Sequence, residues 1–327
     1  MLIVNQCNVN SRNIYISPIR IVTMRKITVI PTMKRAFSCV IHHPTVVVPF
    51  TVFFLVIGLI IVYTFSRFFE LFDMVASAEE APFAVMGGIF GFFAFIFLII
   101  LFVFFTFPFF EGWTFAAAAS AFKNESVSIV DAARKALSKY IGLVVITFIM
   151  VLAWLVVGSI LSIIISVVIF AMTASFTPIP SEYSPAPSIT QFYGMAVMYG
   201  IMIVIMVAFM VIFIYMKPAY IVSGKRFSES LGDGFDTTKK NFLPSFLIVL
   251  FFVLVPFLVN GVLWAVLTVG GVLDFEELLY PDFAEVTSLF PVLIVVGAVL
   301  VIVNVVFYAA FYAAVTYAYM DSHEMVS

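Results

Sequence analysis

The sequence predicts an all-α fold, a polytopic membrane helix bundle with six transmembrane helices, and three observations lead to this prediction. First, 64% of the 327 residues are hydrophobic and only 10% are charged, whereas soluble domains have about 45–50% apolar and about 25% charged residues. Second, six long apolar stretches alternate with polar segments. Third, lysines and arginines gather before the odd-numbered stretches. No water-soluble fold could bury so much apolar surface, so we expect the bilayer to be the solvent.

Each of the six apolar stretches is long enough to cross a membrane. A hydrocarbon core about 30 Å thick requires about 20 apolar residues per helix. No stretch contains a charged residue. The stretches run from Thr45 to Thr64, Phe83 to Phe110, Ile141 to Phe170, Met195 to Tyr215, Phe246 to Val269 and Pro291 to Ala318.

The orientation of the spans follows from the distribution of lysine and arginine, which remain on the cytoplasmic side of short loops. Six of these residues precede span one, four lie between spans two and three, and five lie between spans four and five. The opposite side receives only Arg67. We therefore predict a protein of the cell membrane with both termini in the cytoplasm.

The polar segments before the odd-numbered spans contain related motifs, which indicate an internal repeat. Ser128-Ile-Val-Asp131 precedes span three, and Ser230-Leu-Gly-Asp233 precedes span five, 102 residues later. Thr28-Val-Ile-Pro31 stands 100 residues before the first of these motifs. Each motif is expected to cap a helix. The prediction is three parallel repeats, about 24–126, 127–228 and 229–327, each an amphipathic interfacial helix followed by a transmembrane hairpin.

The first 23 residues have little periodicity, and a helical pattern starts at Met24. We therefore expect translation to begin at Met24 and residues 1–23 to be a non-native or disordered extension. Residues 24–327 would then form a single six-span membrane domain.

The three predicted interfacial helices carry apolar residues at helical spacing on one face and basic residues on the other. Two interpretations remain open for the basic face. It could contact anionic membrane lipids or a cytoplasmic protein partner, or the helices could be connectors that satisfy their backbones at the interface. The candidate contact residues are Lys34, Arg35, Arg134, Lys135, Lys139, Lys239 and Lys240.

The pattern Ser-x-x-Asp-Ala-Ala-x-x-Ala-Leu, from Ser128 to Leu137 and followed directly by a span, resembles prokaryotic multi-pass membrane domains of the type fused to glycerophosphodiester phosphodiesterases. The resemblance covers about two of the three repeats. It implies a fold rather than an activity, because the chain contains no phosphodiesterase domain and none of its acidic and histidine motifs.

The chemistry available inside the membrane is limited. The six stretches contain no ionisable residue, which argues against proton-coupled transport and intramembrane hydrolysis. Glu111 and Lys217 are expected at the cytoplasmic ends of spans two and four, with their charges reaching water by snorkelling. Two cysteines and three histidines form no disulfide or zinc-ligand pattern, so no cofactor or metal is predicted. The net charge is −2 and the sequence contains no nucleic-acid recognition motif, so we predict no binding to nucleic acid.

Uncharged polar residues in spans five and six support a cavity hypothesis. Asn304, Tyr308 and Tyr312 recur every four residues on one helical stripe, and Pro256 and Asn260 indicate a helix interruption in span five. These five residues could line a central polar cavity for a neutral or amphiphilic substrate. The alternative is packing between helices together with an interfacial tyrosine belt.

Three functional classes remain open from the sequence. The preferred class is a multi-pass membrane protein without catalytic chemistry that acts as a scaffold, lipid-interacting module or complex subunit. The second is a permease that uses the polar cavity, and the third is a lipid-modifying enzyme. A homo-oligomer through the small-residue pair Gly87 and Gly91 is a further option, although a single pair of this kind often occurs by chance.

Overall fold

The computed structural model describes residues 24–76, 82–176, 189–269 and 283–326. These residues are helical apart from short turns, and no strand occurs among them. The all-α class is therefore confirmed. The helices are α1 (Val29–His42), η1 (Pro44–Val46), α2 (Val48–Ala76), α3 (Pro82–Phe122), α4 (Ile129–Ser138), α5 (Tyr140–Phe176), α6 (Ile189–Phe213), α7 (Met216–Val222), α8 (Phe227–Lys240), α9 (Phe242–Val269) and α11 (Phe283–Ser322).

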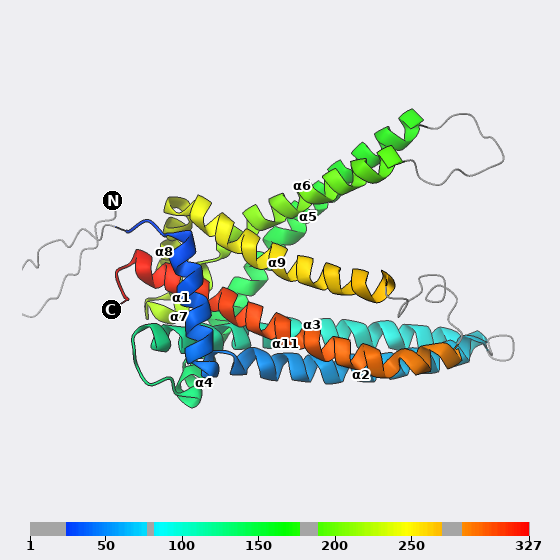
Figure 1. The fold of residues 1–327 in the computed structure, drawn as a ribbon, viewed down its shortest axis with the longest axis horizontal. Helices are drawn as coiled ribbons and strands as arrows, with labels where there is room; N and C mark the ends of the chain where they lie inside the picture. Colours follow the sequence, from blue (N-terminus) through cyan, green and yellow to red (C-terminus); the bar gives the residue numbers. More distant parts are fainter. Residues whose placement is uncertain (1–23, 77–81, 177–188, 270–282, 327) are drawn as a thin grey trace, which may run out of the picture.

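Six helical segments of the described chain have the length and composition to cross a membrane, as the sequence predicts. They are Pro44–Thr64, Gly87–Phe122, Tyr140–Val168, Gly200–Val222, Phe242–Leu263 and Val295–Ser322. The chain is thus a multi-pass membrane protein. The two described ends of the chain lie at the same end of the bundle (Figure 1), as an even number of crossings requires.

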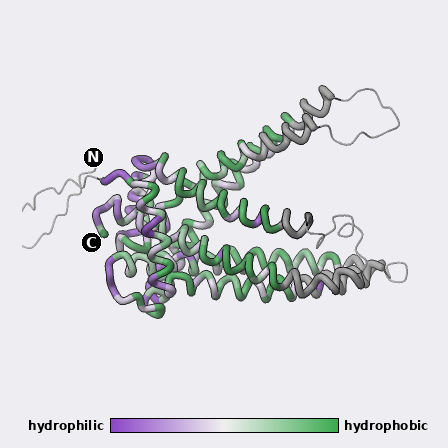
Figure 2. The backbone as a smooth tube through the Cα atoms, in the orientation of Figure 1, coloured by the Kyte–Doolittle hydropathy of each residue, from purple (hydrophilic) through white to green (hydrophobic). Residues whose placement is uncertain are grey.

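Hydrophilic residues concentrate at one end of the molecule (Figure 2). We call this end the polar head. It consists of α1, α4, α7 and α8 together with the adjoining ends of the long helices. From the polar head, α2, α3 and α11 extend as one group, whereas α5 and α6 diverge from them as a pair (Figure 1). Apolar residues cover most of the long helices (Figure 2).

A short helix precedes each odd-numbered span, and the three predicted helix starts have different outcomes. The Ser128 hydroxyl caps α4 by accepting a hydrogen bond from the Asp131 N–H at 3.2 Å. Thr28 occupies the N-cap position of α1 without a side-chain hydrogen bond. The cap predicted at Ser230 is wrong, because α8 begins at Phe227 and Ser230 lies buried inside it.

These three helices turn small residues toward the core. Thr32, Ala132 and Gly234 are buried at spacings of 100 and 102 residues. Ala36, Ala136 and Thr238 repeat the same arrangement one turn later. Small side chains allow each helix to lie close to the helices beneath it.

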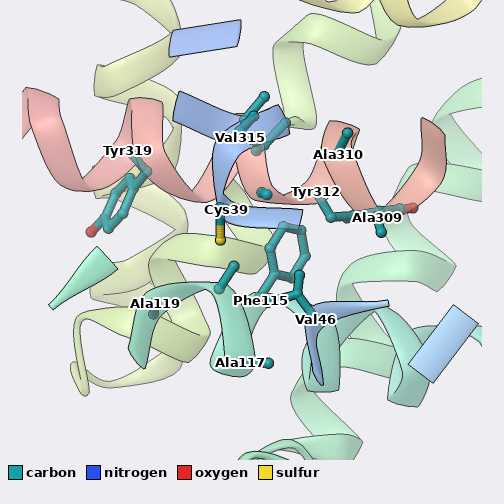
Figure 3. Packing of buried hydrophobic residues seen from close by; sticks show 14 of the residues in the cluster. Cys39, Val46, Phe115, Ala117, Ala119, Ala309, Ala310, Tyr312, Val315 and Tyr319 are labelled. Atoms are coloured by element: carbon teal, nitrogen blue, oxygen red, sulfur yellow. The ribbon is translucent and has the colours of Figure 1, made fainter. Parts of the chain in front are cut away.

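The main core of the polar head is rich in alanine and lies between α1, α3 and α11. Figure 3 shows this packing, with Ala117 and Ala119 of α3 facing Ala310 and Val315 of α11 around Cys39. Two small residues of span six, Ala310 and Ala314, are fully buried in this core. Gly87 and Gly91 have open space where a Cβ would stand, so no described residue packs closely against that side of either glycine.

Two prolines have different effects on their helices. The interruption expected at Pro256 is absent, because α9 continues through it from Phe242 to Val269. Pro218 instead coincides with a break in span four, where α6 ends at Phe213 and α7 starts at Met216. Proline has no N–H to donate to the carbonyl four residues earlier, which is that of Ile214. A turn at Ile214 and Tyr215 interrupts the helix at this point, and Lys217 lies buried just after it.

Candidate functional site

A buried ion pair between Glu111 of α3 and Lys217 of α7 lies at the centre of the polar head. Only 4% of Glu111 and 6% of Lys217 are exposed. The expectation that both charges reach water by snorkelling is therefore wrong. The physical reason is that α3 continues as a helix to Phe122, so Glu111 lies three turns before its end, inside packed protein.

The third member of this site is Tyr312 of α11. Its hydroxyl donates a hydrogen bond of 2.5 Å to Oε1 of Glu111, while Lys217 donates to Oε2. Both carboxylate oxygens thus have a donor. The three side chains come from the spans two, four and six, which the site joins. We call Glu111, Lys217 and Tyr312 the buried triad.

Aromatic rings enclose the buried triad and keep water away. The Tyr312 ring is stacked on Phe50, with 5.0 Å between ring centroids, and meets the edge of Phe115 at 5.1 Å. Figure 3 shows Phe115 pointing up toward Tyr312. In such surroundings the removal of either partner of the ion pair is strongly destabilising, because it leaves a lone charge buried away from water.

A second group of buried hydrogen bonds links α7, α8 and α9. The hydroxyls of Tyr215 and Ser245 lie 2.8 Å apart, and the Ser245 hydroxyl also lies 2.7 Å from the Asn241 carbonyl. The Asn241 side chain accepts the Ile27 N–H at 3.0 Å. The chain before α1 is thereby fixed to the junction of α8 and α9. These hydrogen bonds therefore have a structural role, because they hold the helices together.

The candidate cavity residues are not brought together as one site. Tyr308 and Tyr312 both pack on Phe50, and the Asn304 amide donates to the Leu300 carbonyl of its own helix at 2.7 Å. Asn260 and Pro256 are half-buried on α9. In the described part of the chain, no hydrogen bond joins Asn260 to the span-six stripe. Whether these residues line a cavity stays a prediction.

Several hydroxyl groups in the spans donate to carbonyls of their own helices. The hydroxyls of Thr64, Thr106 and Ser159 donate to carbonyls four residues earlier, at 2.7–2.8 Å. The hydroxyl of Thr147 does the same at 3.0 Å. A side chain that bonds its own helix has no donor left for a neighbouring helix or a solute. These residues are therefore weak candidates for a substrate path.

The candidate contact residues on the amphipathic helices lie on the surface of the polar head. Of the seven, Lys139 is the exception, because it is half-buried with its ammonium 4.6 Å from the centre of the Tyr220 ring. The exposed residues are Lys34 and Arg35 on α1, Arg134 and Lys135 on α4, and Lys239 and Lys240 on α8.

Burial and charge repulsion both act on one of these cations. Partial desolvation, followed by the positive charges of Lys123 and Lys139, lowers the pKa of Lys135, although Glu125 acts in the opposite direction. An anion placed beside α4 would relieve this repulsion. Among the described residues, no three His, Cys, Asp or Glu side chains are grouped so that they could hold a metal ion.

Sequence reasoning missed Glu111 and Lys217 as site residues. The signal that could have identified Glu111 is the alanine-rich run at 116–119 that follows it in the same helix. Alanines at this density indicate close helix packing rather than a lipid-facing or water-facing end. For Lys217 the adjoining Pro218 predicts a break in the span, but not its direction.

No family model, curated protein or solved structure matches this chain. The resemblance of Ser128–Leu137 to the phosphodiesterase-associated membrane domains therefore stays a prediction.

Proposed function

We propose that this chain is a non-enzymatic, multi-pass protein of the cell membrane whose polar head lies in the cytoplasm and binds the anionic leaflet. In this role it serves as a lipid-interacting scaffold or as a subunit of a complex. The proposal adds an orientation to the six-span architecture, with the polar head on the cytoplasmic side of the membrane. The lysines and arginines of the polar head support this orientation.

The observation that carries the proposal is the combination of exposed basic residues on α1, α4 and α8 with exposed apolar residues where these helices meet their spans. Ile41, Ile141 and Leu243 stand at equivalent positions where each short helix meets its span, and they are 74%, 78% and 66% exposed. Side chains of this size are costly in water but suit the boundary between headgroups and acyl chains. We infer that the three helices, as three repeats, lie on the leaflet.

The basic residues supply the second part of the interaction. Six exposed cations lie on α1, α4 and α8, the short helices that precede the three spans. Each lysine or arginine near an anionic membrane surface contributes about 1 kcal/mol at physiological ionic strength. The sum over six cations is an upper limit, because neighbouring cations repel each other. Even half of it would produce a clear preference for anionic over zwitterionic lipid.

The test is the lipid composition that remains bound to the protein. The full chain is reconstituted with equal amounts of phosphatidylglycerol and phosphatidylcholine, released gently into detergent, and its bound lipids are counted by native mass spectrometry. We expect phosphatidylglycerol to be enriched several-fold. A variant with glutamine at Lys34, Arg35, Arg134, Lys135, Lys239 and Lys240 should lose the enrichment.

The matched control exchanges lysine and arginine at the same six positions and so retains the charge. It should retain the enrichment. An equal mixture of the two lipids on the wild-type protein would contradict lipid recognition, as would an enrichment that survives neutralisation. A protein partner bound in stoichiometric amount would support the role of complex subunit.

A permease is the second candidate, and the buried triad is the observation that favours it. Paired charges between spans are a frequent mark of ion and substrate paths. Solute uptake into proteoliposomes that is lost in the Glu111→Gln variant but unchanged in the lipid-contact variant would support this function. The self-satisfied hydroxyls of the spans favour the first proposal instead.

A further inference from the structure

A cavity of about 260 Å³ opens on the polar head between the C-terminal ends of α1 and α3. It lies at the level where the chain enters the membrane, because His43 directly precedes span one and Phe122 ends span two. It is lined by Arg35, Ser38, Cys39, His42, His43, Ala121, Phe122, Asn124 and Val326.

The lining is basic and contains no carboxylate. Arg35 is exposed and has no ion-pair partner among the residues that the structure describes. The two imidazoles of His42 and His43 are the only other titratable nitrogen groups of the lining. The charge of Arg35 is thus uncompensated inside a concave site, which is the condition for binding an anion.

One hydrogen-bonding group, the His42 imidazole, is oriented before any ligand arrives. The Nδ1–H of His42 donates to the Ser38 carbonyl at 2.8 Å, which fixes the ring. Its Nε2 can then accept a hydrogen bond from the hydroxyl of a phosphate monoanion, or donate one to a phosphate oxygen when the imidazole is protonated. His43 has no side-chain hydrogen bond to another described residue. A guanidinium group with its planar fork of donors matches the oxygens of a phosphate.

Helix polarity opposes an anion here, since α1 and α3 both point their negative ends toward the cavity. The last turns of both helices reduce this effect. The Cys39 carbonyl accepts the His43 N–H at 2.8 Å. The carbonyls of Ser120 and Ala121 accept N–H groups of the turn that follows α3, in which Asn124 has a left-handed φ of 55°.

The apolar part of the lining suits a lipid. Ala121, Phe122 and Val326 form a wall beside the start of span one. The volume is slightly below the range of about 300–1,000 Å³ that is typical of small-molecule sites. A headgroup fits such a space, whereas the acyl chains would stay in the bilayer.

We propose that this cavity binds a phosphate monoester, the group that phosphatidic acid presents as a lipid and inorganic phosphate resembles in solution. Arg35 and the two histidines would hold the phosphate oxygens. The lipid source depends on the proposed contact between the polar head and the leaflet, whereas binding of soluble phosphate does not.

The test compares Arg35 with Lys26, an exposed cation outside both the cavity and the six proposed lipid contacts. The full chain is placed in phosphatidylcholine nanodiscs, and the dissociation constants of dioctanoyl phosphatidic acid and of inorganic phosphate are measured by calorimetry. In the Arg35→Gln variant we expect binding about tenfold weaker, because a hydrogen-bonded charge is lost. Since Lys26 does not line the cavity, Lys26→Gln should change the affinity less than about twofold.

A second variant, His42→Gln with His43→Gln, should also weaken binding without touching the core, because His42 is exposed and His43 is half-buried. Phosphatidic acid binding that depends on Arg35, without phosphate binding, supports the lipid as ligand. Dependence on Arg35 for both probes supports a site for the phosphate group itself.

Two results would overturn the proposal. These are a wild-type protein that binds neither probe, and equal affinities in the Arg35→Gln and Lys26→Gln variants. The two proposals, phosphate binding in the cavity and lipid binding by the polar head, can be contradicted separately. If phosphatidylglycerol is enriched but the two variants have equal affinities, only the cavity proposal is contradicted. If phosphate binding depends on Arg35 but no lipid is enriched, only the proposal of wider lipid contact is contradicted.

Discussion

Removal of the ammonium group of Lys217 is expected to destabilise the protein far more than removal of a comparable lysine at the surface. Lys217→Met leaves the Glu111 carboxylate buried, with the Tyr312 hydroxyl as its only remaining donor. Breaking a buried pair in this way costs about 3–5 kcal/mol. The matched control is Lys225→Met, which breaks the pair with Asp233 where the lysine side chain is 43% exposed. An exposed pair contributes about 0.2–1 kcal/mol.

The double variant Glu111→Leu with Lys217→Met separates a charge effect from a packing effect. Replacing both charges by apolar groups leaves no lone buried ion, so most of the lost stability should return. The measurement is the midpoint of thermal unfolding in nanodiscs, at about 2 °C per kcal/mol for a chain of this size. The single variant should then fall by about 6–10 °C. Equal shifts for Lys217→Met and Lys225→Met would refute this account, as would a double variant less stable than either single one.

Three further predictions concern packing, reactivity and pH. In α8, Gly234→Ala should destabilise by about 1–3 kcal/mol because its Cβ would stand 2.8 Å from the Met216 backbone, whereas Gly232→Ala, with open space around it, should stabilise slightly; thermal unfolding of both variants checks this. Burial raises the pKa of Cys39 to about 12, so in a Cys7→Ser background the native protein should resist maleimide labelling until it is unfolded. Burial also lowers the pKa of His323, and a histidine that is harder to protonate when folded makes the protein less stable as pH falls through the unfolded value of about 6.5. Unfolding midpoints at pH 7 and pH 5 should therefore differ less in His323→Gln than in the wild type.

The spans were predictable because their signal is local. About 20 consecutive apolar residues identify a membrane helix whatever its neighbours are, and the six predicted stretches overlap the six observed ones. The capping hydroxyl of Ser128 was predictable for the same reason, since a cap and its N–H lie three residues apart. The prediction that Ser230 caps α8 was wrong because α8 starts before the motif, at Phe227. Gly224, with a φ of 69°, follows the end of the preceding helix and leaves room for this early start.

The buried triad could not be predicted in this way, because its members are far apart in the sequence. Glu111 and Lys217 are separated by 106 residues, and Tyr312 lies 201 residues from Glu111. A charge near the end of an apolar stretch fits snorkelling and fits a buried pair equally well. Only the position of α7 relative to α3 distinguishes the two, and that position depends on the break before Pro218 and on the packing of Gly112 against Leu143.

The distribution of polar groups connects the fold to the proposed function. The paired charges and the buried hydrogen bonds between helices described above lie in the polar head, whereas the hydroxyls of Thr64, Thr147 and Ser159 in the spans bond carbonyls of their own helices. Helices α5 and α6 diverge from the α2, α3 and α11 group (Figure 1), and the described outer face of α5 carries Leu155, Ile160 and Ile163. A polar solute gains nothing from such surfaces, whereas lipid chains cover them at no cost in hydrogen bonds. Specific recognition is therefore expected at the polar head, where cations, a cavity and the membrane surface meet.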